Sequence, residues 1–547
     1  DTVKSLRVIQ ACLDSQGDGS NEESEDTSSS LSEICDYIGR IILPVVPTSN
    51  DDDSDDGIFQ SRQQKLPVLN FMLIYILDPA SAAQTHFLFK GELGLNILRT
   101  LSNRNPFTLT SSALLSMVAY TNPQDPWTSD ASADIARSLL QSQFSQEATG
   151  KPVSKAEFIT DTLLTLHLRP LFSKSRPATI NASGRKAAFV EEMTSTMLED
   201  RANKLWKYAH VYAVTVFEWA VTNAAVTTTT ASKQTTTTGD NVAVPLLAKT
   251  WHLFTPVLLT LLDESETALK IRTLAIFGAF WSGCPPGLME QVGLASVFED
   301  AAFPAVHFLP NITPEDESRR ILSAAYPVLF QLAGITASSQ SEEESTGTTV
   351  LTTAQRKLLD RIIREGILTG YFHAKNHIQL TAVFCEKLSY AVNGMGILSV
   401  KYLKYAMLTR GSPFHVQDIF PMISEIMTNP FGTKHTPSLL AAIQLLQAVL
   451  RCCWPRISGY QNEIIRMLTV CWLNIADEDD WATSDNTAPT KEDLEAQLTK
   501  TAAMLSSIIR NNSQDDQDRD QPSIVLDDLV SPLIKKEPLL APLFAGQ

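Results

Sequence analysis

The chain has 547 residues, of which 44% are hydrophobic and 19% charged, and its 61 acidic against 44 basic residues give a net charge of -17. This length exceeds one ordinary globular core, whereas a repeat array escapes the limit because each unit packs only on its neighbours. The acidic balance argues against direct binding to nucleic acid, and the basic residues gather only in pairs such as Arg319-Arg320.

Cysteine usage and apolar run lengths indicate the environment of the protein. The seven cysteines are odd in number and scattered, which favours buried free thiols in a reducing compartment. The longest apolar runs, such as Leu66–Leu77 and Ala209–Val216, are shorter than the roughly 20 residues that span a bilayer. We therefore expect a soluble intracellular protein without a signal segment or a membrane contact.

Polar, acidic or low-complexity stretches interrupt the apolar patterns. They are Ser15–Ser30, Thr48–Gly57, Thr121–Asp130, Thr227–Asn241, Ser338–Thr349, Ala476–Thr490 and Asn511–Gln521. We expect surface loops between helices, partly disordered, and a Thr-rich insert at Thr227–Asn241. The acidic serines around Ser24 and Ser54 are alternatively kinase targets.

From residue 246 onwards, helical periodicity follows at repeat spacing. Two series each step by three or four residues, the spacing of one helix face: Leu247, Trp251, Phe254, Leu258, Leu261, and Leu294, Phe298, Ala301, Ala305, Phe308. Pro256 and Pro304 lie at matching places, separated by close to the roughly 40–47 residues of a HEAT-type repeat. Each proline removes a backbone donor, so we expect both helices to bend there.

Helix start and stop signals continue towards the C-terminus. Thr313-Pro314 and Thr436-Pro437 predict N-caps followed by a proline at the first helical position, and Gly334 predicts a helix end. The predicted core faces are Ile321, Leu322, Ala325, Leu329 and Leu332, then Leu439, Ile443, Leu446 and Leu450, then Ile464, Leu468, Cys471 and Ile475. Since no strand of useful length is evident, we predict an all-α chain: an irregular HEAT-like α-solenoid of paired antiparallel helices with long acidic or polar loops.

No catalytic, cofactor-binding or metal-binding constellation can be assembled from the sequence. His373, His377 and Cys385 have a spacing that suits a metal, but the surface of a helix is the better interpretation of the two histidines. Gly394-Met-Gly396 lacks a dinucleotide fingerprint and predicts a turn that ends a helix. Adjacent carboxylates such as Glu299-Asp300 do not converge on one substrate atom. We therefore predict no enzyme and no cofactor.

Several of these segments resemble one family. They are Lys249–Leu253, Val292–Asp300, His307–Pro310, Thr313–Ser318, Leu322–Pro327, Ser399–Leu403 and Cys453–Ile457, followed by Cys471-Trp472. Together they are similar to the second Tel-interacting (Tti-type) subunit of the TTT co-chaperone complex. The resemblance divides the chain into an N-terminal helical-repeat region with acidic loops (1–243), a family-characteristic repeat core (244–475) and an acidic loop with C-terminal helices (476–547).

The resemblance implies a non-enzymatic scaffold in cytoplasm and nucleus. Its expected partners are the Tel subunit and the first Tti subunit, its clients are phosphatidylinositol-kinase-like (PIKK) protein kinases, and the ninety-kilodalton heat-shock chaperone acts with it. An importin-like cargo adaptor of HEAT repeats is the alternative function, and it would bind basic signals in a salt-dependent way.

A docking surface for the first Tti subunit is predicted where the recognisable motifs concentrate. It comprises Val297, Phe298, Glu299, Asp300, Trp454 and Arg456. The alternative is that these residues only lock neighbouring repeats together. Tryptophan is enriched at interface anchors, but at helical spacing we expect Trp454 and Trp472 in the core more often than on the surface, and we leave Trp481 open.

Overall fold

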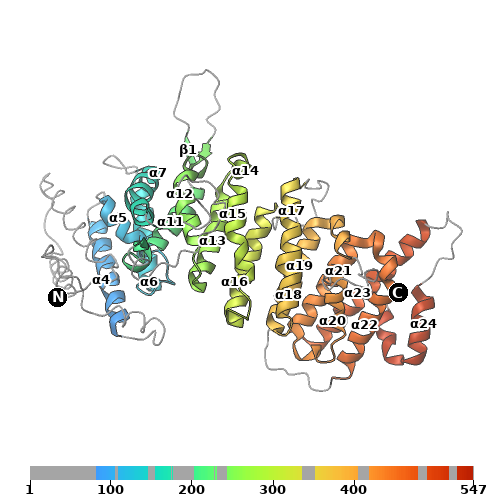
Figure 1. Ribbon diagram of the computed structural model, residues 1–547. Helices are drawn as coiled ribbons and strands as arrows, with labels where there is room; N and C mark the ends of the chain where they lie inside the picture. Colours follow the sequence, from blue (N-terminus) through green and yellow to red (C-terminus); the bar gives the residue numbers. More distant parts are fainter. Residues whose placement is uncertain are drawn as a thin grey trace, which may run out of the picture. The chain divides into compact units, whose positions relative to one another are not determined.

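The computed structural model describes most of the chain from residue 82 onwards (Figure 1). The described ranges are 82–104, 109–145, 154–173, 175, 203–226, 228–230, 243–335, 351–403, 418–478, 489–515 and 526–545. Apart from one pair of short strands, all their regular elements are helices, which confirms the predicted all-α class. Two units are distinguished: the first runs to Glu264 and includes Ile276–Val297, and the second comprises Ser265–Ala275 and everything from Phe298 on. The predicted division at 243 and 475 stays a prediction.

The first unit is built from helices that pack on near neighbours in sequence. Its elements are α4 (Ala82–Arg104), α5 (Ser111–Val118), α6 (Asp130–Ser145), α7 (Lys155–Glu157), η1 (Phe158–Leu168), α8 (Arg169–Phe172), α10 (Leu205–Tyr208), α11 (Ala213–Val226), α12 (Leu246–Leu262), the end of α13 (Thr267–Gly283) and α14 (Leu288–Gln291). Helix α6 packs on α4 and α5, while α11 packs on η1 and α12. Each apolar face is thus covered by an adjacent helix, as in a repeat array.

Helices α7, η1 and α8 follow one another without a break, and η1 is a π-helix of 11 residues. The Arg169 amide bonds the carbonyl of Leu164, five residues back, and the Thr165 hydroxyl likewise reaches Thr160 O at 2.7 Å. Pro170 follows directly, and its ring has no N–H and crowds the preceding turn. The wider turn accommodates that crowding. The sequence periodicity did not reveal this element.

The N-terminal part of the Thr-rich insert is not a loop, contrary to the sequence prediction. Strand β1 (Thr228–Thr230) pairs antiparallel with β2 (Ala243–Pro245), with Thr229 opposite Val244. Threonine has a high strand propensity because its branched side chain suits extended backbone. Residues 231–242 of the insert lie outside the described residues.

The two prolines that we expected to bend helices behave differently. Pro256 lies inside α12, whose Leu247, Phe254, Leu258 and Leu261 are buried as predicted. Pro304 is not inside an α-helix, because α15 (Ala295–Ala302) ends before it and the 3₁₀ turn η2 (Phe303–His307) takes over. At that position the prediction of a bend is wrong. The lost donor terminates the helix instead.

The second unit consists mainly of two rows of helices. After η2 come α16 (Glu315–Leu332), α17 (Thr353–Arg361), the π-helix η4 (Ile362–Leu368), α18 (Thr369–Ala374), α19 (Ile378–Met395), η5 (Gly396–Tyr402), α20 (Ile419–Met427), η6 (Gly432–Lys434), α21 (Thr436–Ile457), η7 (Ser458–Tyr460), α22 (Gln461–Ala476), α23 (Lys491–Asp515), α24 (Leu526–Lys536), η9 (Pro538–Leu540) and α25 (Ala541–Phe544). One row has α16 on α19, α19 on α21 and α21 on α23. Helices α18, α20 and α22 form the other row, each packing on the helix that follows it. This is the predicted arrangement of helix pairs.

Polar contacts connect the members of the α18–α20–α22 row. Glu425 on α20 accepts from Tyr371 on α18 at 3.1 Å and pairs at 2.8 Å with Lys375, the residue that follows α18. Ser424 donates to Glu463 on α22 at 3.0 Å and accepts from Arg466 at 2.8 Å. The helices of this row are therefore joined by hydrogen bonds as well as by apolar packing.

Between α21 and α23 the apolar packing contains one buried carboxamide. Gln447 is 5% exposed, and its Nε2 donates to Gln497 O at 3.2 Å, Gln497 Oε1 at 3.0 Å and Thr501 Oγ1 at 3.0 Å. Leu446 and Leu450 on either side are fully buried. A buried amide is tolerated only where its hydrogen bonds are made, and here α23 supplies the partners.

Helix boundaries follow the predicted signals with small shifts. Pro314 caps α16 with extended backbone, so the helix begins one residue later than predicted, and Thr313 is not its cap. The imidazole of His435, not Thr436, caps α21 by accepting from the Ser438 amide at 3.3 Å.

Gly334 ends α16 as predicted, with φ of 79°. The Ile335 amide then bonds Phe330 O at 2.9 Å, which completes a Schellman motif. Gly396, with φ of 56°, likewise ends α19.

The core positions predicted on α16, α21 and α22 are all buried, and the described cysteines are free thiols. One stretch, 436–476, is apolar and long enough to cross a membrane by length and composition, although our run-length estimate found none. In its most apolar window 61% of the residues are buried inside the protein, and α21 is kinked at Cys453 before Pro455. These features are typical of a core helix.

The Schellman motif at Gly334 generates a stability prediction. The change Gly334→Ala should lower the free energy of unfolding by about 1–2 kcal/mol, because an L side chain is strained at this positive φ. Urea unfolding followed by circular dichroism measures the loss. Gly459→Ala is the control, since a Cβ there meets no atom within 4 Å and φ is ordinary. An equal loss in both variants would contradict the role of the motif.

A buried histidine in η1 generates a pH prediction. Burial and, secondarily, the nearby His210 lower the pKa of His167 from 6.5 to about 4, and its Nε2 has no hydrogen-bond partner among the described residues. As pH falls from 6.5 towards 4, the unfolded chain binds a proton that the folded chain does not, so stability falls by up to about 3 kcal/mol. His167→Phe should flatten this slope, whereas His373→Gln on the exposed end of α18 should leave it unchanged. Parallel slopes for His167→Phe and wild type would refute the assignment.

Candidate functional site

A groove lies between α6 and α11 in the first unit and has a volume of about 770 Å³. We call it the α6–α11 groove. It is lined by Thr121, Asn122, Pro123 and Gln124 of the α5–α6 connection, Arg137, Leu140, Gln141, Phe144 and Ser145 of α6, Lys155 of α7, and Thr215, Glu218, Trp219, Thr222 and Asn223 of α11. Its size falls within the range of about 300–1,000 Å³ that is typical of ligand pockets. It is the candidate binding site that sequence analysis did not find.

One wall of the groove is the α5–α6 connection, and it is well packed. Trp127 donates its indole N–H to Ala119 O at 2.9 Å, and the buried Asp125 accepts from the Thr215 hydroxyl on α11. The prediction of a solvated, partly disordered loop at Thr121–Asp130 is therefore wrong in this respect. The residue in the sequence that could have predicted an ordered connection is Trp127, an apolar residue within an otherwise polar stretch.

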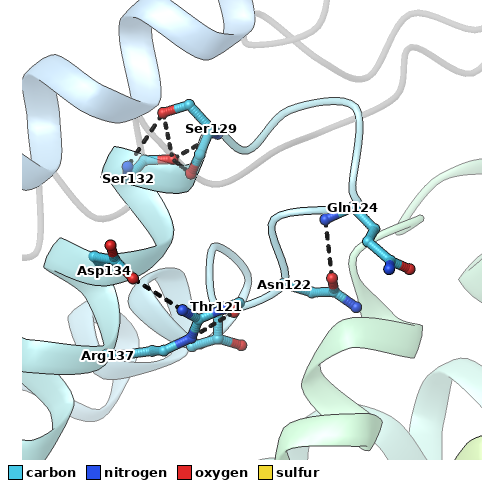
Figure 2. Close-up of polar contacts among 7 residues, drawn as sticks. All are labelled: Thr121, Asn122, Gln124, Ser129, Ser132, Asp134 and Arg137. Carbon is cyan, nitrogen blue, oxygen red and sulfur yellow. Dashed lines mark hydrogen bonds and ion pairs between the residues drawn. The ribbon is translucent and has the colours of Figure 1, made fainter.

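The start of α6 is fixed by reciprocal hydrogen bonds (Figure 2). The Ser129 hydroxyl accepts from the Ser132 amide at 3.1 Å, and the Ser132 hydroxyl accepts from the Ser129 amide at 2.8 Å. This is a capping box in which serine replaces the usual glutamate. Arg137, one turn further on, holds Thr121 O at 3.1 Å and Asp134 at 3.0 Å. Arg137 therefore ties α6 to the wall of the groove.

Aromatic rings form the inner end of the groove. Phe144 and Trp219 have ring centroids 6.0 Å apart, and both pack on the buried Phe158. The Lys155 ammonium lies 5.9 Å from the centroid of Trp219. Burial lowers the pKa of Lys155, and no carboxylate in the described part of the chain pairs with it. The groove thus combines an aromatic surface with a partly desolvated cation.

The acidic pair Glu299-Asp300, predicted to bind a partner, takes part in an internal cluster. Arg361 on α17 lies 3.1 Å from Glu299, 3.5 Å from Asp300 and 3.2 Å from Glu365. Its guanidinium also stacks 3.9 Å above the ring of Phe303. Burial alone would lower the pKa of Arg361, but the carboxylates raise it above its ordinary value. These contacts give Glu299 and Asp300 a role in holding α15 to α17, which is the alternative to partner docking that the sequence left open.

The other predicted docking residues are divided between α15, which carries Val297 and Phe298 next to the acidic pair, and α21. Phe298 is completely buried, and Val297 beside it is half-buried. Trp454 and Arg456 lie on α21 after the kink at Cys453, and Trp454 is 47% exposed. The preferred core interpretation of Trp454 is therefore wrong, because its side chain lies on the outer face of this end of α21, while Cys453 and Ile457 are buried on the inner face.

The remaining tryptophans divide between core and undescribed chain. Trp472 is 7% exposed and donates its indole N–H to Leu539 O at 2.8 Å, so its predicted core position is confirmed. Trp481 lies outside the described residues.

The histidines with metal-like spacing do not form a site. His373 is on α18 and His377 caps α19, so the single helix predicted for them is interrupted. His377 Nδ1 lies 3.0 Å from Glu315, and Cys385 is buried in α19. Within the ranges that the structure describes, no group of three His, Cys, Asp or Glu residues is arranged to hold a metal ion.

The Arg361 cluster generates a coupling prediction. Arg361→Met should lower the free energy of unfolding by about 1 kcal/mol, because it removes half-exposed ion pairs and a cation–π contact while keeping the aliphatic packing. In the Arg361→Met variant, Glu299→Gln should not lower the free energy of unfolding further, whereas in the wild-type protein the same change should lower it. Arg356→Met, exposed on the same helix, is the control. Additive losses would contradict the internal role of Glu299.

Comparison with known proteins identifies the chain. Its sequence matches the Tti2 family over residues 113–434, a span that begins in α5, contains the α6–α11 groove and the Arg361 cluster, and ends in η6. No curated protein matches it, and no solved structure matches it. Because the family match extends over more than half of the chain, the protein belongs to the Tti2 family.

Proposed function

We propose that the protein is a non-enzymatic scaffold subunit of the TTT co-chaperone complex, with PIKK-family protein kinases as its clients. Membership of the Tti2 family carries this proposal, because the family has a co-chaperone role within TTT. The paired-helix architecture suits the role, since stacked helices present extended surfaces for other proteins.

The proposal extends to partners and location. The Tel subunit and the first Tti subunit are the direct partners, and the ninety-kilodalton heat-shock chaperone acts with the assembled complex on newly made kinases. The protein would accordingly be found in cytoplasm and nucleus. The predicted absence of nucleic-acid binding is supported by the net charge of -17, which disfavours contact with phosphate.

We infer that the first Tti subunit docks on the second unit, which carries all of the predicted residues Val297, Phe298, Glu299, Asp300, Trp454 and Arg456 except Val297, the last residue of the first unit. Among these residues, Trp454 and Arg456 are exposed, which supports a direct contact. Tryptophan and arginine are enriched at interface hot spots, because each covers a large area at low entropic cost. Phe298 would act from the core by shaping the surface.

A tagged affinity purification from native cells at moderate salt tests the function. Mass spectrometry should recover two other large helical-repeat proteins in near-equal amount, with giant kinases in smaller quantity. Recovery of transport receptors with basic cargo would instead favour the importin-like alternative. Absence of any stoichiometric partner would refute the scaffold proposal.

The docking surface gives a prediction for variants. The double change Trp454→Ala with Arg456→Glu should reduce recovery of the first Tti subunit at least about tenfold, with an unchanged melting temperature, because both side chains face solvent. Arg510→Glu, exposed on α23, is the matched control. Charge reversal at Glu299 and Asp300 should lower stability through Arg361. If recovery is unchanged in all variants, the docking surface lies elsewhere.

A further inference from the structure

We propose that the α6–α11 groove binds an extended acidic peptide segment of a partner protein, with a carboxylate of that segment paired to Lys155. The groove belongs to the first unit, and the inference does not rest on the co-chaperone proposal. The observations that carry it are the surroundings of Lys155, the carboxamides along the groove and its aromatic end.

Lys155 sets the sign of the ligand. A partly buried ammonium is costly unless an anion or a π-face compensates it, and the distance of 5.9 Å to Trp219 gives only weak compensation. The other basic residue in the lining, Arg137, is already held by Asp134 and Thr121 O. Glu218, the carboxylate in the lining, accepts from Asn122 at 3.0 Å and keeps its charge. A ligand carboxylate beside Lys155 would complete a charge-assisted hydrogen bond.

The carboxamides indicate a peptide and not a simple anion. Asn122, Gln124, Gln141 and Asn223 all line the groove. Each carboxamide carries a donor and an acceptor, and this pair matches the N–H and C=O of an extended backbone. Asn122 and Asn223 already make contacts to Glu218 and to Trp219 O. Gln124 is exposed, and Figure 2 shows its carboxamide without a partner among the residues drawn.

The volume of the groove agrees with a short segment. A volume of about 770 Å³ accommodates a few residues, not a folded domain. The half-buried Phe144 and Trp219 offer apolar surface for alternate side chains, and strand geometry directs alternate side chains to the same face. Backbone contacts would then supply affinity, while the aromatic end and Lys155 would supply specificity.

The test uses the full chain and an array of acetylated, amidated hexapeptides with one fixed glutamate, each printed beside its glutamine counterpart. Wild type should retain glutamate peptides about tenfold better than their counterparts. Lys155→Glu should reverse the preference towards peptides with a fixed lysine. A reversal cannot result from misfolding, so this variant keeps the inference falsifiable. Lys249→Glu, exposed on α12, should keep the wild-type preference.

Three outcomes would overturn the proposal. They are retention of no peptide above background, equal retention of glutamate and glutamine peptides, and a glutamate preference that survives Lys155→Glu. A fourth concerns the acidic sequence of this chain itself, Asp51–Asp56. If peptides bind only after its aspartates are changed to asparagine, the occupant is the chain itself and not a partner. None of these outcomes depends on recovery of TTT subunits, so the two proposals fail independently.

Discussion

The second unit depends on the apolar seam that α21 makes with α19 on one side and α23 on the other. Leu439, Ile443, Leu446 and Leu450 are buried in it, and removal of such surface from water is the dominant favourable term in folding. A helix with apolar surface on two sides cannot stand alone, so α21 requires both neighbours. The same requirement to cover apolar surface applies to each neighbouring helix, so helices stack one on the next and form an array.

Several charges in the described part of the protein fix helices to one another. Arg361 holds α17 to α15, Glu425 connects α18 to α20, and the buried Glu264 pairs with Lys204 at 2.7 Å and Lys207 at 2.9 Å. Burial alone would raise the pKa of Glu264, but the two lysines hold it below the ordinary value. Because these charges are satisfied internally, charged side chains without such partners among the described residues, such as Lys155, become informative about binding.

The helices could be predicted from the sequence because apolar periodicity reports burial directly. The series from Ile321 to Leu332 and from Leu439 to Leu450 became core faces as expected. Helix ends were predicted less well, because caps such as His435 depend on a hydrogen bond that no local pattern specifies. The strand pair at Thr229 and the π-helix around Thr165 were missed as well, because both are defined by backbone hydrogen bonds that apolar periodicity does not report.

The candidate sites were the least predictable part. The groove joins Asn122, Lys155 and Trp219, which are far apart in the chain, so no spacing rule brings them together. Motif arguments instead favoured Glu299-Asp300, a pair that Arg361 holds internally. Trp454 is 47% exposed between the buried Cys453 and Ile457, a difference that helical spacing alone does not reveal.

The buried carboxamide of Gln447 has a consequence for how the seam is assembled. Leucine-rich helix faces fit together almost equally well after a shift of one turn, since apolar contact has no direction. After such a shift Gln447 would lose Gln497 and Thr501 and remain desolvated without partners. One polar side chain thus penalises misaligned pairings of α21 and α23, and the penalty acts while the chain folds, when many apolar surfaces compete.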